Sequence, residues 1–130
     1  MPQFDLSATT EGESAVLALS GEVDLATGPA VRDCLQELTG NGARYVIVDL
    51  RQVDFLDSIG LGVLIAAYRR LRERELAGWL RLVCTNERVI RVFAHTGLLR
   101  IFPMYASVEQ ARAADEHDPG GPAGTANRPE

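Results

Sequence analysis

The chain has 130 residues, of which 46% are hydrophobic and 24% are charged, and its formal net charge is −5. This length fits one domain, and the composition is that of a globular protein rather than a disordered or collagen-like chain. The negative charge argues against nucleic acid as the main partner, because phosphate binding needs a cationic surface. All thirteen basic residues are arginine, which excludes mechanisms that need a lysine amine, such as a Walker-type phosphate loop.

The first third of the chain predicts a hairpin followed by a helix. Strand-like runs over residues 4–10 and 14–20 flank a polar turn, and Leu17 and Leu19 alternate with Val16 and Ala18 in the second run. Thr27-Gly28-Pro29 then begins a helix, with a capping hydroxyl and a proline in the first turn, and Gly40-Asn41-Gly42 stops it.

The rest of the chain alternates strands and helices. We expect strands over residues 45–50, 79–84 and 101–104, and helices that begin near Asp57-Ser58, Thr85-Asn86 and Ser107 and end near Gly78, Gly97 and Ala114. Ser107 and Gln110 form a capping-box pattern. The order predicts an α/β domain over residues 1–114, with a mixed sheet of four to five strands and about four helices. Residues 115–130, rich in proline and glycine, are expected to be a flexible tail.

Cys34 and Cys84 are far apart in the sequence and show no metal-ligand spacing, so we expect two buried free thiols and neither a metal site nor a cofactor. The longest apolar stretch, residues 59–68, is too short to cross a bilayer. The expected location is the cytoplasm, with no contact to a membrane.

Enzyme signatures are incomplete. Gly60 and Gly62 lack the third glycine of a dinucleotide fingerprint, and His95, at a predicted helix end, is expected to cap that end rather than to catalyse. One enzymatic alternative stays open, a small nucleotide-hydrolysing domain that holds a metal ion with Asp24, Asp49, Asp54 and Asp57. The absence of a phosphate-binding loop argues against it, so we expect no enzymatic activity.

The distinctive segment covers residues 53–62, where a buried strand leads through Asp57-Ser58 into a helix. Either residue could cap that helix, a contribution of about 1 kcal/mol. Gly60 and Gly62 would each cost the helix about 1 kcal/mol relative to alanine. We expect them to leave the backbone of Ser58 open to another macromolecule, with close packing of the helix on the sheet as the alternative.

This segment carries a family resemblance. Gly21-Glu22-Val23-Asp24, Val48-Asp49-Leu50, the run from Phe55 to Leu64 and Thr96-Gly97-Leu98 resemble a STAS domain, and most of all the bacterial anti-sigma factor antagonists. The resemblance covers about residues 4–112. It implies a small mixed sheet flanked by helices. It also implies a protein that binds an anti-sigma factor with serine kinase activity and so frees a sigma factor.

In that family the kinase phosphorylates a serine of the antagonist, which ends the binding, and a serine phosphatase reverses it. The resemblance places the phosphoacceptor at Ser58, supported by Asp24 and Asp57. It implies partner contacts at Asp24, Thr27, Ser58, Ile59, Gly60 and Leu61. Ile59 departs from the family, which commonly has serine or threonine there, so Ser58 is the sole local acceptor. The alternative within this family is a scaffold or subunit of a stress-sensing or transport complex.

Overall fold

A computed structural model of the chain describes residues 3–114. Five strands and four α-helices follow one another along it, with one 3₁₀ turn at Leu98–Arg100. The strands are β1 (Asp5–Glu11), β2 (Ser14–Val23), β3 (Tyr45–Leu56), β4 (Trp79–Val83) and β5 (Met104–Tyr105). The helices are α1 (Gly28–Gly40), α2 (Ser58–Leu71), α3 (Glu87–His95) and α4 (Val108–Ala113).

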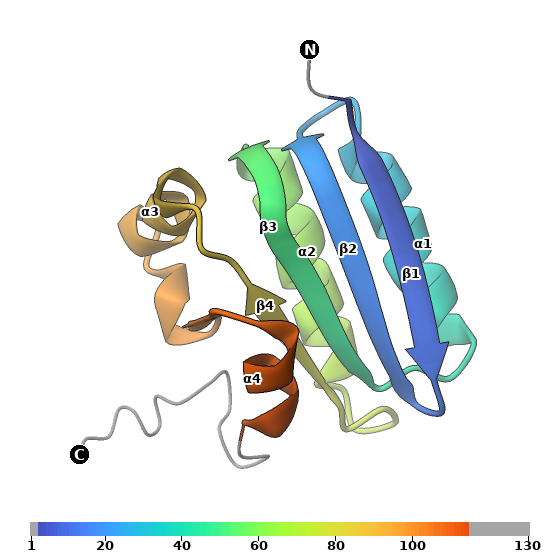
Figure 1. The fold of residues 1–130 in the computed structure, drawn as a ribbon. Coiled ribbons are helices and arrows are strands. Elements are labelled where there is room, and N and C mark those ends of the chain that lie inside the picture. Colours follow the sequence, from blue (N-terminus) through green and yellow to red (C-terminus); the bar gives the residue numbers. More distant parts are fainter. Residues whose placement is uncertain (1–2, 115–130) are drawn as a thin grey trace, which may run out of the picture.

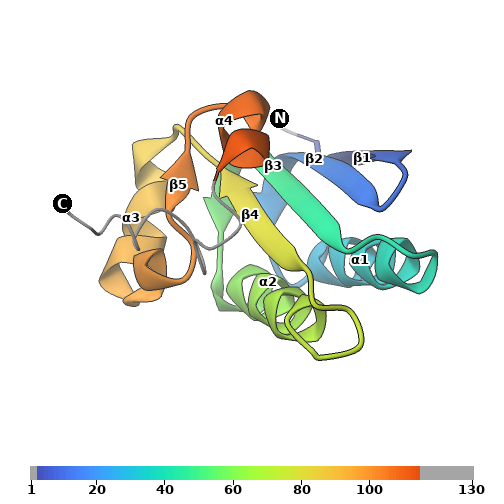
Figure 2. The same cartoon turned by 90° about the horizontal axis from the view of Figure 1, so that it is seen from below.

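The strands form one mixed sheet in the order β1-β2-β3-β4-β5. β1 and β2 are antiparallel, and every other neighbouring pair is parallel. Helices α1 and α2 cover one face of the sheet, α4 lies against the other face, and α3 lies beside the β4–β5 end (Figures 1 and 2). The predicted α/β class, the mixed sheet and the helix count are confirmed.

The main core lies between the sheet and the helices α1 and α2. Leu17 and Leu19 of β2 point into it, whereas Val16 and Ala18 lie on the opposite side, as the alternation predicts. The continuous apolar run of β3 is buried on both faces, because α4 covers Ile47 while Val46 and Val48 face the main core. A second, small cluster, built from Ile47, Val83 and Ala111, lies under α4.

Several boundaries differ from the sequence-based expectation. β3 runs to Leu56 rather than to residue 50, because its pairing with β2 continues across register shifts through residues 51–54, of which only Val53 is apolar. α2 ends at Leu71 rather than near Gly78, and β5 lies at 104–105 rather than 101–104. Gly78 packs so closely that a Cβ there would lie 1.9 Å from the carbonyl oxygen of Arg44, which brings β4 alongside β3.

The two cysteines are free thiols, but only Cys84 is buried and Cys34 is half-buried. Burial raises the pKa of each thiol above its ordinary value. Within residues 3–114, no helix has the length and apolar character needed to cross a membrane. The expected tail at 115–130 lies outside the described residues.

Candidate functional site

Two neighbouring strand ends bring the predicted acidic residues together. Val23 of β2 and Leu56 of β3 are partners in the sheet, and Asp24 and Asp57 are the next residues of the two strands. The backbone N–H of Asp57 donates to the carbonyl oxygen of Val23 at 3.2 Å. The loop before α1 and the loop before α2 therefore leave the same edge of the sheet side by side.

Asp57 caps helix α2. Its Oδ1 atom accepts hydrogen bonds from the backbone N–H groups of Ile59, at 2.9 Å, and Gly60, at 3.0 Å. Its backbone is extended, as the capping position requires. Ser58 becomes the first residue of the helix, and its side chain is exposed. Of the two caps that the sequence allows, the structure uses Asp57 and leaves the Ser58 hydroxyl to solvent.

Asp24 shapes the loop before α1. Its Oδ1 atom accepts hydrogen bonds from the backbone N–H groups of Ala26 at 3.0 Å and Thr27 at 3.1 Å. The Thr27 hydroxyl donates to the carbonyl oxygen of Glu22 at 2.7 Å, and it makes no capping bond to helix α1. The expectation that this hydroxyl caps α1 is wrong, because the preceding loop already binds it.

Gly60 is a packing residue. It is buried, and a Cβ there would lie 2.9 Å from the carbonyl oxygen of Val23 and 3.1 Å from Cδ1 of Leu56. Close packing of the helix on the sheet, the alternative that the sequence left open, is therefore what this glycine permits, and the approach of a partner to the Ser58 backbone stays a prediction. Leu61 is only 8% exposed and faces the core, so at the start of α2 the exposed side chains are those of Ser58 and Ile59.

The glycine pair gives a matched test of this packing. We expect Gly60→Ala to lower the free energy of unfolding by about 1–3 kcal/mol, because the added methyl group meets backbone that cannot move aside. Gly62, in the same helix, is exposed with nothing within 4 Å of its Cβ position. Gly62→Ala should raise the free energy of unfolding by up to about 1 kcal/mol. Urea unfolding of both variants measures the difference, and equal effects would contradict the packing role.

Two variants of Asp57 separate the effect of its capping hydrogen bonds from the effect of its charge. Asp57→Ala removes both hydrogen bonds to the helix start, and we expect it to cost about 1 kcal/mol in urea unfolding. Asp57→Asn keeps an oxygen that can accept the same bonds, so its stability should stay within about 0.5 kcal/mol of the original. A loss of the same size in the asparagine variant would show that the charge, and not the hydrogen bonds, stabilises the helix.

The two adjoining strand ends and the start of α2 expose large apolar side chains. The three large apolar residues most exposed in residues 3–114 are Leu25 (72%), Phe55 (49%) and Ile59 (41%). Leu25 lies in the Asp24 loop, Phe55 near the end of β3 and Ile59 beside Ser58 in α2, and Cγ2 of Ile59 lies 3.1 Å from a Cβ position at Gly28. We call Leu25, Phe55, Ser58 and Ile59 the Ser58 face. The exposure of Leu25 and Phe55 was not predicted from the sequence.

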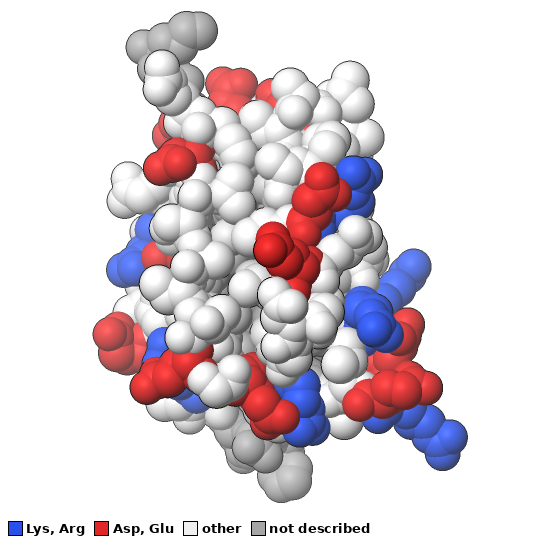
Figure 3. Space-filling view, turned by 90° about the vertical axis from the view of Figure 1, so that its right-hand side faces the viewer, with Lys and Arg blue, Asp and Glu red and all other residues white. Residues whose placement is uncertain are grey.

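The segments that form this face are acidic. Glu22, Asp24, Asp54 and Asp57 belong to residues 21–31 and 52–68, which contain no arginine. Elsewhere the charges are mixed: on the side formed by β1 and α1, red and blue side chains alternate without a large block of either sign (Figure 3). No broad cationic surface is visible on that side, and the Ser58 face would meet an added anion with negative neighbours.

The metal-binding alternative receives no support from the geometry. Asp49 forms an ion pair with Arg51, with Oδ2 and Nη2 2.7 Å apart. Burial opposes the ionisation of Asp49, but the hydrogen bonds and charge of Arg51 outweigh it and hold the pKa of Asp49 below its ordinary value. Asp24 and Asp57 bind backbone amides. In residues 3–114, no group of three His, Cys, Asp or Glu residues is arranged to hold a metal ion.

Comparison with known proteins identifies the class of this fold and site. The model of the STAS domain family matches residues 5–111, and the chain belongs to this family. An anti-sigma-B factor antagonist of Bacillus subtilis is 35% identical over 91 residues, which is 70% of this chain and 81% of the relative.

Solved structures agree with this assignment. An anti-sigma factor antagonist from Mycobacterium paratuberculosis superposes with a TM-score of 0.75 at 27% identity, covering 85% of this chain and 92% of that one. The anti-sigma factor antagonist SpoIIAA in its unphosphorylated form gives a TM-score of 0.72 at 26% identity, covering 85% and 93%. Its phosphorylated form gives 0.65 at 25% identity, covering 85% and 96%.

Proposed function

We propose that the chain is a cytoplasmic anti-sigma factor antagonist that binds an anti-sigma factor through the Ser58 face. The observation that carries the proposal is an exposed serine at a helix start, on adjoining segments that also expose Leu25, Phe55 and Ile59. Exposed apolar side chains on neighbouring segments are typical of a protein–protein contact. The relatives named above are anti-sigma factor antagonists, and one of their structures is a phosphorylated form.

Phosphorylation of Ser58 by the anti-sigma factor, acting as a serine kinase, would end the binding, and a serine phosphatase would restore it. Ser58 is the acceptor that the local geometry favours. Ile59 has no hydroxyl, and the Thr27 hydroxyl is half-buried and already donates to the Glu22 carbonyl. The Ser58 hydroxyl, in contrast, is exposed at the first position of α2.

The switch acts on binding rather than on folding. A phosphate adds a charge of about −1.5 to −2, and a helix N-terminus accepts an anion, so the domain should stay folded. In a complex, the same anion is desolvated beside Asp24 and Asp57. A penalty of about 4 kcal/mol would weaken the complex about a thousandfold.

Substitution of Ser58 tests this switch. Ser58→Ala should bind the anti-sigma factor with unchanged affinity and resist the kinase. Ser58→Asp should bind about tenfold or more weakly, because one carboxylate carries less charge than a phosphate. Ser7→Asp, at an exposed serine on β1, is the matched control and should bind as the original does. Calorimetry measures the affinity of each variant for the anti-sigma factor. Equal affinities for Ser58→Ala and Ser58→Asp would contradict the proposed switch.

The apolar side chains of the Ser58 face make a separate prediction. Leu25→Ala and Phe55→Ala should each weaken binding about tenfold or more, because they remove apolar surface that a partner would bury. Their thermal stability should hardly change, since both side chains are exposed in the free domain. Gln36→Ala, at an exposed position of α1, serves as the control. Unchanged affinity in both variants would place the docking surface elsewhere.

A further inference from the structure

Helix α3 carries a row of basic residues on its exposed side. Arg88, Arg91 and His95 follow one another at steps of three and four residues, which places them on one face of the helix. All three are exposed, whereas Val89 and Phe93, on the opposite face, are buried in the core. We call Arg88, Arg91 and His95 the α3 row.

The charge of this part of the chain has the opposite sign from that of the Ser58 face. Residues 88–108 contain three arginines and no aspartate or glutamate, and Glu87 is the only acidic residue of α3. The segments that form the Ser58 face contain four acidic residues and no arginine. The chain therefore separates positive charge on α3 from negative charge around Ser58.

Asn86 holds α3 beside the Ser58 face. Its Nδ2 atom donates to the carbonyl oxygen of Val53 in β3 at 3.1 Å, and its Oδ1 atom accepts a hydrogen bond from the backbone N–H of Arg88 at 2.9 Å. One side chain thus joins the start of α3 to the strand that carries Phe55, two residues beyond Val53. Figure 1 shows α3 beside the end of β3.

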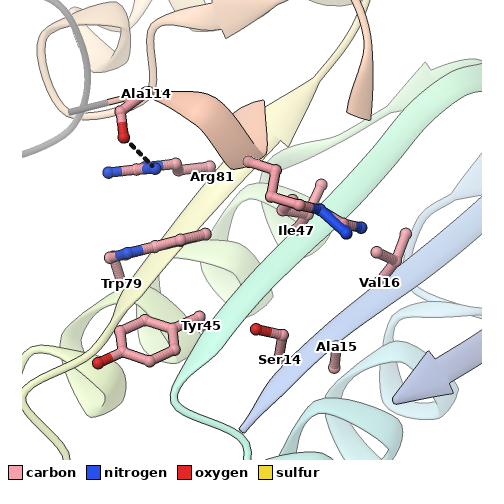
Figure 4. A pocket seen from close by; sticks show the side chains of 9 residues that line it. Ser14, Ala15, Val16, Tyr45, Ile47, Trp79, Arg81 and Ala114 are labelled. Atoms are coloured by element: carbon pink, nitrogen blue, oxygen red, sulfur yellow. Dashed lines mark hydrogen bonds between the residues drawn. The ribbon is translucent and has the colours of Figure 1, made fainter. Parts of the chain in front are cut away.

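Other arginines of the chain are engaged within the fold. Ion pairs hold Arg32, Arg44, Arg51 and Arg70. Arg81 is 2% exposed, its Nη1 atom donates to the carbonyl oxygen of Ala114 at 3.2 Å, and its guanidinium carbon lies 3.9 Å from the centre of the Trp79 ring (Figure 4). Within residues 3–114, no ion pair holds Arg88 or Arg91, so a partner could pair with both charges.

We propose that the α3 row binds an acidic patch of the anti-sigma factor while the Ser58 face binds the same molecule, an inference that rests on the function proposed above. A nucleic acid or an anionic membrane carries charge of one sign, so α3 would attract it and the adjoining acidic face would repel it. A protein surface can present both signs side by side and match both regions. Insertion into a membrane also needs exposed apolar side chains, and within residues 3–114 the large ones lie on the Ser58 face.

The α3 row should act mainly on the rate at which the complex forms. Complementary charges steer two proteins into contact and raise the association rate constant, and salt screens this effect. Apolar contacts such as those of Leu25 and Phe55 form after the first encounter and act mainly on the dissociation rate constant. Kinetic measurements can therefore separate the contributions of the two regions.

The test measures the association rate constant with the anti-sigma factor that co-purifies with the chain from its own cells. Arg88→Glu/Arg91→Glu should lower this constant about tenfold at about 0.05 M NaCl, and about 0.5 M NaCl should remove most of the difference. The control Arg69→Glu/Arg74→Glu changes the net charge equally at exposed positions near the C-terminal end of α2. The control should lower the constant less than about twofold, because its charges lie far from the contact.

Equal rate constants for the two double variants would overturn the inference. Thermal unfolding shows whether both variants fold. If Arg88→Glu/Arg91→Glu does not fold, Arg88→Gln/Arg91→Gln replaces it, with an expected loss of about threefold because the charge is removed rather than reversed. The matched control is then Arg69→Gln/Arg74→Gln.

Failure of this inference differs from failure of the proposed function. An anti-sigma factor that binds the original chain and both double variants at equal rates would contradict the α3 contact alone, whereas a lack of binding to the original chain would overturn both. Two further measurements identify other occupants of the α3 row. Binding to phosphatidylserine vesicles, or self-association in sedimentation, that Arg88→Glu/Arg91→Glu abolishes would assign the row to a membrane or to a second copy, and either result would overturn the inference.

Discussion

The backbone carbonyl of Val23 is the point on which the geometry around Ser58 depends. It accepts the N–H of Asp57, and Gly60 packs directly against it. The hydrogen bond from Asp57 joins the ends of β2 and β3. The packing of Gly60 lets the start of α2 lie directly against the sheet, because no side chain separates them. Ser58 lies between these two contacts in the sequence, so backbone atoms on both sides of it set its position.

This arrangement separates the residues that build the site from those that remain free to act. The carboxylates of Asp24 and Asp57 are each engaged by two backbone amides, and the Thr27 hydroxyl is bound within the loop. A phosphate on Ser58 would still lie in the favourable field of the helix N-terminus, but the N–H groups of Ile59 and Gly60 are already bound by Asp57. Most of its charge would therefore be stabilised by solvent in the free domain, and a complex would remove that solvent. The hydrogen bonds of Asp57 that stabilise the helix start therefore also leave a phosphate on Ser58 dependent on solvent, so that phosphorylation weakens binding of a partner.

The sequence predicted the fold well because its patterns are local. Alternation in β2, the apolar run of β3 and the capping signals at Asp57 and Ser107 each act over a few residues, and Ser107 does accept the N–H of Gln110. The extension of β3 to Leu56 could not be predicted, because register shifts against β2 maintain the pairing where the sequence turns polar. Close packing at Gly60 was one of two interpretations of the sequence, but its neighbour could not be named, since Val23 lies 37 positions earlier in the chain.

The sequence indicated the polar residues of the candidate site but not its apolar surface. Asp24 and Asp57 follow neighbouring strand ends and Ser58 begins α2, whereas the exposure of Leu25 and Phe55 was not predicted and Leu61 is buried. An isolated leucine in a polar turn gives no signal of its exposure until the turn is built. Phe55 belongs to a strand whose other apolar residues are largely buried, and the pairing irregularities of that strand are what free it.

The most direct test begins with isolation of the chain from its own cells, together with the anti-sigma factor that co-purifies with it. Mass spectrometry then locates the phosphate, and calorimetry compares the phosphorylated and dephosphorylated chains as ligands of that factor. We expect a phosphate on Ser58, and we expect the phosphorylated chain to bind the anti-sigma factor about a thousandfold more weakly than the dephosphorylated chain. A phosphate confined to another residue, or equal affinities for the two forms, would contradict this expectation.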